Sequence, residues 1–213
     1  MKAKVITFPV GIYQCNCSII YCTESKEAIV IDPGSEAETI LREINDQGLT
    51  VKAVIHTHAH LDHFGATSEV SEETNAPVYL HADDKQLWDI ADLQADMLGI
   101  PKCPHANIDH FIEDTQTFNF GKFKLEAIHT PGHSAGSTCF KIENGDEQIL
   151  FSGDTLFRRS VGRTDLPSGD TPTIIKSIKE RLYTLDTDTK VVPGHGPSTK
   201  IGEERKENPF VSI

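Results

Sequence analysis

The 213-residue chain lacks any excess of basic residues. It carries 20 lysines and arginines against 32 aspartates and glutamates, for a net charge of −12. Nucleic-acid binding depends on neutralising phosphates with a positively charged surface, so this balance excludes a general nucleic-acid-binding function. The overall field also repels anions, and an anionic substrate would therefore need a local group of cations.

Long hydrophobic runs and paired cysteines are also missing. No apolar run approaches a membrane span, and the N-terminal segment lacks the continuous apolar stretch of a signal peptide. The five cysteines are odd in number and show no spacing typical of a small disulfide-stabilised domain. These absences predict a soluble cytoplasmic protein with reduced thiols and no membrane partner, in which Cys15 and Cys17 are buried rather than metal-binding.

The chain does contain enough apolar residues for a core. Hydrophobic residues make up 38% of the chain and charged residues 24%, which excludes extended disorder. No internal repeat is detectable and no linker divides the sequence. We therefore expect one domain over residues 1–213.

Hydrophobic periodicity predicts two halves with the same plan of strands and helices. Alternating or β-branched segments predict strands at 4–8, 18–21, 28–31, 52–55, 78–80, 117–120, 123–129, 137–142, 148–152 and 190–192. Helical spacing predicts helices at about 35–47, 65–74, 82–98 and 171–185, and residues 201–213 form a charged tail. In the third helix, Ile90 and Met97 should face inward and Trp88 should pack in the core. The expected class is α/β, with two packed sheets and helices outside.

The chemistry is concentrated in one stretch, residues 55–65. It contains His58, His60, Asp62 and His63 in the pattern His-x-His-x-Asp-His, directly after a predicted buried strand. Imidazole and carboxylate groups bind divalent metals, and side chains two apart in an extended loop point the same way. His58 and His60 can therefore share one metal, while Asp62 and His63 can face a second.

Three further ligand candidates stand beside glycines just after predicted strands. They are His133, Asp154 and His195. Strand ends of this kind can meet at one edge of a sheet, so the joint pattern predicts convergence on the first motif. The remaining histidines are expected to be structural or solvated, and they are His56, His81, His105, His110 and His129. For His56 we expect a bond to a carboxylate behind the ligands.

These motifs closely resemble those of the metallo-β-lactamase superfamily over nearly the whole chain. The resemblance rests on Thr-His-x-His-x-Asp-His at 57–63, Pro-Gly-His-Ser-x-Gly at 131–136, Gly-Asp-Thr at 153–155 and Gly-His-Gly at 194–196. Within the superfamily the chain is similar to the glyoxalase II-like hydrolases. The resemblance implies a four-layer αββα sandwich of two mixed β-sheets with outer helices, and two metals at one edge.

The resemblance also implies how the ligands divide between the metals. The first metal would be held by His58, His60 and His133, the second by Asp62, His63 and His195, and both by Asp154. Zinc is the expected metal, with iron or manganese as alternatives. Water activated between two such cations can attack an acyl carbonyl at neutral pH. Asp62 and Asp154 are the expected catalytic carboxylates.

Departures from relatives narrow the implied reaction. Secreted β-lactamases of this superfamily have a signal peptide and usually a cysteine where Asp154 stands, which argues against antibiotic hydrolysis. RNA-processing members carry an added domain, for which this chain is too short. The resemblance therefore implies hydrolysis of a small-molecule thioester, as in hydroxyacylglutathione hydrolase. The chain ends 18 residues after His195, too few for the helical domain with which classical glyoxalase II grips glutathione, so glutathione recognition stays open.

Another reaction on the same fold is also compatible with the sequence. The Gly-Arg-Thr-Asp segment at 162–165 occurs in short glyoxalase II-like hydrolases and in persulfide dioxygenases. The dioxygenases use a single iron held by residues matching His58, His133 and Asp154. Arg163 is a candidate for binding a substrate carboxylate, and the alternative is a buried pair with the aspartate two residues later. A metal-binding protein without hydrolase activity is the third hypothesis.

Overall fold

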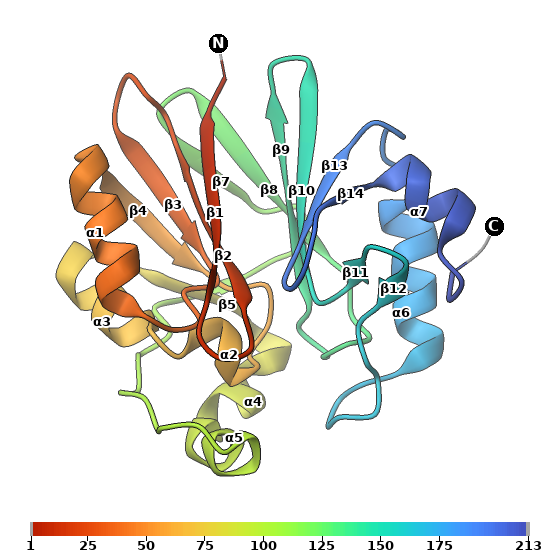
Figure 1. Cartoon of the computed structure of the whole chain (residues 1–213), viewed down its shortest axis with the longest axis horizontal. Coiled ribbons are helices and arrows are strands. Elements are labelled where there is room, and N and C mark those ends of the chain that lie inside the picture. The colour runs from red at the N-terminus through yellow and green to blue at the C-terminus, as the bar shows by residue number, and fades with distance from the viewer. Residues whose placement is uncertain (1, 212–213) are drawn as a thin grey trace.

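Two six-stranded β-sheets form the centre of the computed structural model, which describes residues 2–211 (Figure 1). The first sheet has the order β1-β2-β3-β4-β5-β6. Its strands are β1 (Lys4–Val10), β2 (Cys15–Tyr21), β3 (Glu27–Ile31), β4 (Thr50–Ile55), β5 (Val78–His81) and β6 (His110–Ile112). The first three are antiparallel neighbours, whereas β3 to β6 run parallel.

The second sheet has the order β14-β13-β10-β9-β8-β7. Its strands are β7 (Thr117–Phe120), β8 (Phe123–His129), β9 (Thr138–Asn144), β10 (Glu147–Gly153), β13 (Lys190–Pro193) and β14 (Thr199–Lys200). All its neighbours are antiparallel except β10 and β13, which are parallel. A separate hairpin joins β11 (Leu156–Phe157) to β12 (Ser160–Val161). Both large sheets are therefore mixed, as expected.

Helices cover the outer faces of both sheets (Figure 1). The α-helices are α1 (Ala37–Gln47), α2 (Leu61–Phe64), α3 (Thr67–Thr74), α4 (Lys85–Asp89), α5 (Ala91–Leu98), α6 (Thr171–Ser177) and α7 (Ile201–Glu207). A 3-10 turn, η1 (Ala82–Asp84), precedes α4, and a π-helical turn, η2 (Ile178–Leu182), continues α6. Because α1 and α3 pack on the first sheet and α6 packs on the second, the predicted αββα layering is confirmed.

The alternating direction of the side chains along each strand produces one apolar layer between the sheets and another beneath the helices. In β3, Ile29 and Ile31 enter the core between the sheets, whereas Val30 faces the helices on the outer side. In β10, Phe151 enters the inter-sheet core and Leu150 packs under α6. Successive side chains of a strand point to opposite faces, so both faces of each central strand are apolar and buried. The polar positions are left at the strand ends.

The helix expected at 82–98 is interrupted. Ile90 adopts a non-helical conformation, with φ −102° and ψ 27°, and separates α4 from α5. As a result Ile90 is 38% exposed and Met97 is 68% exposed, so the expectation that both face inward was wrong. Trp88 packs in the core as predicted and stacks on Phe64 at a ring distance of 4.2 Å.

The C-terminal segment also differs from expectation. Residues 201–207 form α7 because Ile201 enters the core beneath the second sheet and Glu204 is buried in a polar network. The charged residues of the segment occupy its outer side, which is why it resembles a tail in the sequence. Within residues 2–211, no helix has both the length and the hydropathy needed to cross a membrane.

Candidate metal centre

Strands that run in the same direction deliver polar side chains to one edge of the molecule. β3, β4 and β5 are parallel in the first sheet, and β8, β10 and β13 share one direction in the second. The segments after these strands carry Asp32, residues 56–63, Asp84, His133, Asp154 and His195. Residues far apart in the chain thereby become neighbours, and the nitrogens of His63 and His195 lie 3.1 Å apart across 132 positions.

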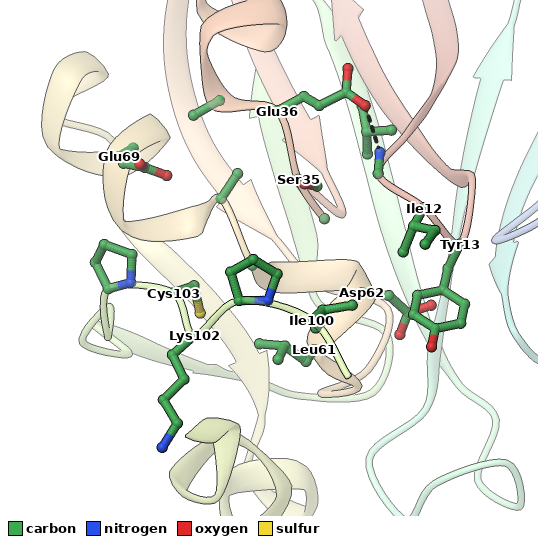
Figure 2. Close-up of a pocket in the computed structure, with 18 of the residues that line it drawn as sticks. Ile12, Tyr13, Ser35, Glu36, Leu61, Asp62, Glu69, Ile100, Lys102 and Cys103 are labelled. Carbon is green, nitrogen blue, oxygen red and sulfur yellow. Dashed lines mark hydrogen bonds between the residues drawn. The ribbon is translucent and has the colours of Figure 1, made fainter. Parts of the chain in front are cut away.

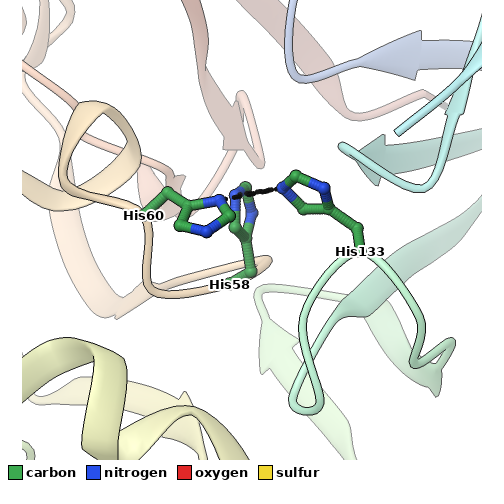
Figure 3. Close-up of side chains that lie close together, drawn as sticks. All are labelled: His58, His60 and His133. Atoms are coloured by element: carbon green, nitrogen blue, oxygen red, sulfur yellow. Dashed lines mark hydrogen bonds between the residues drawn. The ribbon is translucent and has the colours of Figure 1, made fainter. Parts of the chain in front are cut away.

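His58, His60 and His133 form the first group of potential ligands (Figure 3). Nδ1 of His60 lies 2.9 Å from Nε2 of His133, which lies 3.2 Å from Nε2 of His58. The rings meet edge-on, with interplanar angles of 79° to 88°. Imidazole lone pairs lie in the ring plane, so this arrangement directs three of them toward a common centre, as around a divalent metal.

Asp62, His63 and His195 form the second group. Nε2 of His195 lies 3.2 Å from Oδ2 of Asp62, and Nε2 of His63 lies 3.8 Å from the same oxygen. His63 is fully buried, whereas Asp62 and His195 are partly exposed at the mouth of the site. Two nitrogens and one carboxylate oxygen therefore face one point on the open side of the centre.

Asp154 lies between the two groups. Its Oδ1 is 3.4 Å from Nε2 of His63, and its Oδ2 is 3.7 Å from Nε2 of His133 and 3.8 Å from Nε2 of His195. Among the described residues, Asp154 Oδ1 is the buried side-chain oxygen that has no hydrogen-bond partner. A buried carboxylate oxygen without a donor is costly unless a cation satisfies it. The residues present therefore fit two metal ions that share Asp154.

Backbone carbonyls hold two of the ligand imidazoles from behind. Nδ1 of His133 donates to the carbonyl of Arg163 at 2.8 Å, and Nδ1 of His195 donates to the carbonyl of Tyr13 at 2.8 Å. Each bond places the ring proton on Nδ1 and leaves the Nε2 lone pair directed into the centre. Metal-binding histidines are generally oriented by such a bond to their other nitrogen.

A buried carboxylate, Asp32, braces the long motif. Its oxygens accept hydrogen bonds from the Thr57 backbone N–H at 2.7 Å, the Thr57 hydroxyl at 2.6 Å and Nδ1 of His63 at 2.9 Å. Because the Thr57 hydroxyl donates to Asp32, it can accept from Nδ1 of His58, 3.1 Å away. One carboxylate thus orients a ligand from each group, directly for His63 and through Thr57 for His58.

The two groups differ in their electrostatics. Burial, reinforced by neighbouring imidazoles, holds the pKa of His58 well below its usual range and lowers the pKa of His60 to about 3. Burial also opposes protonation of His63 and His195. The neighbouring Cys15 sulfur and nearby carboxylates outweigh it and raise the pKa of His63, and the bond to Asp62 and the charge of Asp154 raise the pKa of His195. His58 and His60 are therefore neutral donors, which is the form that binds metals. The second group would release protons when a metal binds.

Two buried carboxylates beside the metal ligands were missed by sequence reasoning, and they are Asp32 and Asp84. Neither Asp32 nor Asp84 was singled out as a candidate. Asp32 directly follows a buried strand, as Asp154 nearly does, so the same strand-end rule could have found it. Asp84 lies in a 3-10 turn with no local pattern to mark it.

The histidines expected to be structural lie outside both groups. His56 bonds the Tyr79 carbonyl and the Thr67 hydroxyl, so its expected carboxylate partner is replaced by these oxygens. His81 and His129 stack on each other with ring centroids 4.0 Å apart. Parallel rings cannot both direct in-plane lone pairs at one ion, so this stacked pair is not arranged for metal binding.

Cys15 and Cys17 are buried, as predicted, and burial raises the pKa of the Cys15 thiol to about 12.

The guanidinium of Arg163 makes two hydrogen bonds to Asp165, at 2.7 and 2.8 Å. This pair was expected to be buried if it braced the loop, but both side chains are exposed by more than 60%. Arg163 can therefore exchange its partner for another carboxylate.

A cavity of about 640 Å³ adjoins the centre on the side of Asp62 (Figure 2). Its walls include Tyr13, Ile100 and Cys103, together with the carboxylates Glu36 and Glu69. The volume is that of a small-molecule site, and the lining combines apolar surface with carboxylates and one lysine, Lys102, whose ammonium pairs with Asp92 and Asp96.

Gly194 gives a test of how tightly the centre is packed. A Cβ atom there would stand 2.2 Å from Asp154 Oδ1 and 2.7 Å from Cε1 of His63. We expect Gly194→Ala to displace one of these ligands and to lower metal affinity and activity by about 100-fold, because a misplacement of 1 Å can have that effect. Gly196→Ala is the matched control, since its Cβ meets nothing within 4 Å, although its positive φ costs about 1 kcal/mol of stability. Equal metal affinity in the two variants would contradict the close packing.

Comparisons with known proteins show what the sequence and the fold are similar to. Residues 10–195 match the family model described as the metallo-beta-lactamase superfamily. The chain is 37% identical over 219 residues to the hydroxyacylglutathione hydrolase GloC of Haemophilus influenzae, covering 100% of this chain and 99% of the relative.

Two solved structures share the fold over nearly their full lengths. The BLEG-1 B3 metallo-beta-lactamase superposes with a TM-score of 0.89 at 36% identity, covering 99% of this chain and 100% of the other. TTHA1623 in a di-iron-bound form superposes with a TM-score of 0.84 at 38% identity, covering 96% and 99%.

Proposed function

Since the chain belongs to the metallo-beta-lactamase superfamily, we propose that it is a dinuclear metal-dependent hydrolase of thioesters, of the hydroxyacylglutathione hydrolase type. The observation that carries the proposal is the position of Asp154, whose unpartnered oxygen lies between two groups of three ligand atoms. Divalent cations bound there would lower the pKa of water toward neutrality and polarise an acyl carbonyl. Zinc is the proposed metal, with iron or manganese as alternatives.

The side chains of the centre have distinct proposed roles. His58, His60 and His133 would hold the first metal, Asp62, His63 and His195 would hold the second, and Asp154 would be shared by both. Asp154 and Asp62 also act as catalytic carboxylates, because each can accept a hydrogen bond from the attacking water and fix its direction. The thiol of Cys15 does not supply the nucleophile, since it is buried and its pKa is raised to about 12.

The surroundings of the centre suggest how a thioester would lie. The carboxylates of the cavity beside Asp62 disfavour an anionic group, so the cavity suits an uncharged part of the substrate. The carbonyl of Arg163 accepts a hydrogen bond from His133, so Arg163 lies beside the first ligand group. We assign Arg163 to a substrate carboxylate, such as those of a glutathione moiety, which would replace Asp165 on the guanidinium.

One experiment tests the reaction and the metal number together. Purified protein is assayed with S-lactoylglutathione and a panel of other thioesters, and the metal content of the same sample is measured. We expect thioester turnover with two metals per chain. A chromogenic β-lactam is included because of the BLEG-1 likeness, and turnover of the β-lactam without turnover of any thioester would contradict the proposal.

The same sample distinguishes the alternative reaction. A single iron per chain, with oxygen uptake on glutathione persulfide, would support a persulfide dioxygenase that uses His58, His133 and Asp154. The close approach of His133 to both His58 and Asp154, at 3.2 and 3.7 Å, is compatible with such a three-residue iron site. Full metal content without turnover of either substrate class would favour a binding function.

A further inference from the structure

Asp84 is a fully buried carboxylate that connects two ligand loops without being a ligand. Its Oδ2 accepts hydrogen bonds from the Ala59 backbone N–H at 2.9 Å and from the Ser134 hydroxyl at 2.7 Å. Its Oδ1 accepts from the Gly136 backbone N–H at 2.6 Å. Three donors from two separate segments thus converge on one side chain, which stands at the end of η1 after strand β5.

Two of the three donors, Ala59 and Ser134, are adjacent in sequence to members of the first ligand group, and between them they flank all three members. Ala59 lies between His58 and His60, and Ser134 directly follows His133. The first segment follows β4 of one sheet, whereas the second joins β8 to β9 of the other sheet. The distance between His133 and the other two imidazoles is therefore set where the two sheets meet, and Asp84 bonds both sides of that junction.

We propose that Asp84 is a positioning residue for the first metal, a clamp that holds the loop of His58 and His60 in register with the loop of His133. The clamp is closely fitted, because a Cβ atom on Gly136 would stand 2.7 Å from Cγ of Asp84. Asp32 bonds His63 of the second ligand group directly and reaches the first group only through Thr57. Loss of the Asp84 clamp should therefore affect one metal site more than the other. The inference rests on the metal centre of the proposed function, but not on the reaction assigned to it.

Asp84→Asn is the direct test because it changes one atom without changing the volume. The amide nitrogen must replace one of the two oxygens. In one orientation it faces the Gly136 N–H, and in the other it faces the Ala59 N–H, so a donor meets a donor in both cases. One ligand loop must move away, and metal-site partners of this kind typically change affinity by about 10- to 100-fold.

The measurement is competition of Zn²⁺ between the protein and a chelating dye, which yields two dissociation constants. His60→Ala identifies the constant that belongs to the first group, and His195→Ala identifies the constant of the second. We expect Asp84→Asn to weaken the constant identified by His60→Ala by about 10- to 100-fold and the other by less than about threefold. Ser134→Ala, which removes one donor and keeps the carboxylate, should give a smaller effect in the same constant.

Glu204→Gln is the matched control, since it also neutralises a fully buried carboxylate with several donors, on α7. Glu204→Gln should lower the unfolding temperature without weakening one zinc dissociation constant more than the other. If Asp84→Asn weakens both constants equally, or neither, the clamp is refuted. Should that variant fail to fold, Ser134→Ala decides, and unchanged constants there refute the clamp. A wild type that binds two metals but hydrolyses no thioester would overturn the proposed function and leave this inference intact.

Discussion

Replacement of Asp154 by asparagine should lower kcat for the hydrolysed substrate by about 10³-fold or more, while the protein keeps its fold. The amide would direct N–H donors, instead of a negative charge, at one of the two ligand groups. Metal content should fall with activity. The unfolding temperature of the metal-free protein should stay the same or rise, because the wild-type carboxylate is buried with one oxygen unpartnered.

This combination of results separates a metal bridge from a structural carboxylate. Activity, metal content and metal-free thermal unfolding are measured on the same preparation of Asp154→Asn. Asp188→Asn serves as the control, since Asp188 is an exposed carboxylate that pairs with Lys200 away from the centre. Retention of more than about a tenth of the wild-type kcat with full metal content would show that Asp154 does not bridge the metals.

Asp32→Ala should lose much of its stability as well as its activity, whereas Asp154→Asn should lose activity and keep its stability. The substitution leaves the Thr57 N–H, the Thr57 hydroxyl and Nδ1 of His63 without their acceptor in a buried site. Each unsatisfied buried donor costs about 1–3 kcal/mol, and alanine at the left-handed φ of +50° adds about 1 kcal/mol. We expect the free energy of unfolding of the metal-free protein to fall by about 4 kcal/mol or more.

Denaturant unfolding of the metal-free protein measures this loss. Asp32→Asn is the companion variant, since asparagine tolerates the left-handed φ and keeps one acceptor oxygen, so it should lose about half as much stability. A decrease below about 1 kcal/mol in Asp32→Ala would show that the three donors find other acceptors. Together, Asp32→Ala and Asp154→Asn distinguish a residue that stabilises the fold around the site from a residue that binds the metals.

Much of the candidate centre could be predicted because its ligands follow local rules. His58, His60, Asp62 and His63 stand in one short motif, and strand periodicity placed that motif at a strand end. Asp154 and His195 each follow an apolar strand beside a glycine. The alternation of side chains shows where a strand ends. Strands that run in the same direction end at the same edge of the sheet, so the residues that directly follow them lie close together.

The braces behind the ligands could not be found in the same way. Asp84 acts through three donors supplied by two loops, and none of those loops is near it in the sequence. Hydrogen bonds of this kind leave no periodicity or spacing, because the partners meet only after the sheets have packed. The break at Ile90 has a similar origin, since the apolar spacing of 82–98 is continuous while the backbone turns there to form two short helices.

The sequence by itself determined the layered fold and the identity of the residues that meet at the sheet edge, because periodicity and strand-end motifs are local properties of the chain. Only the tertiary structure decided which nitrogen of each imidazole faces inward, that Asp154 Oδ1 is left without a protein donor, and that Asp32 bonds Thr57 and His63 while Asp84 bonds both loops of the first ligand group. Those features depend on atoms of both sheets approaching within hydrogen-bond distance, and no single segment of the chain contains that information.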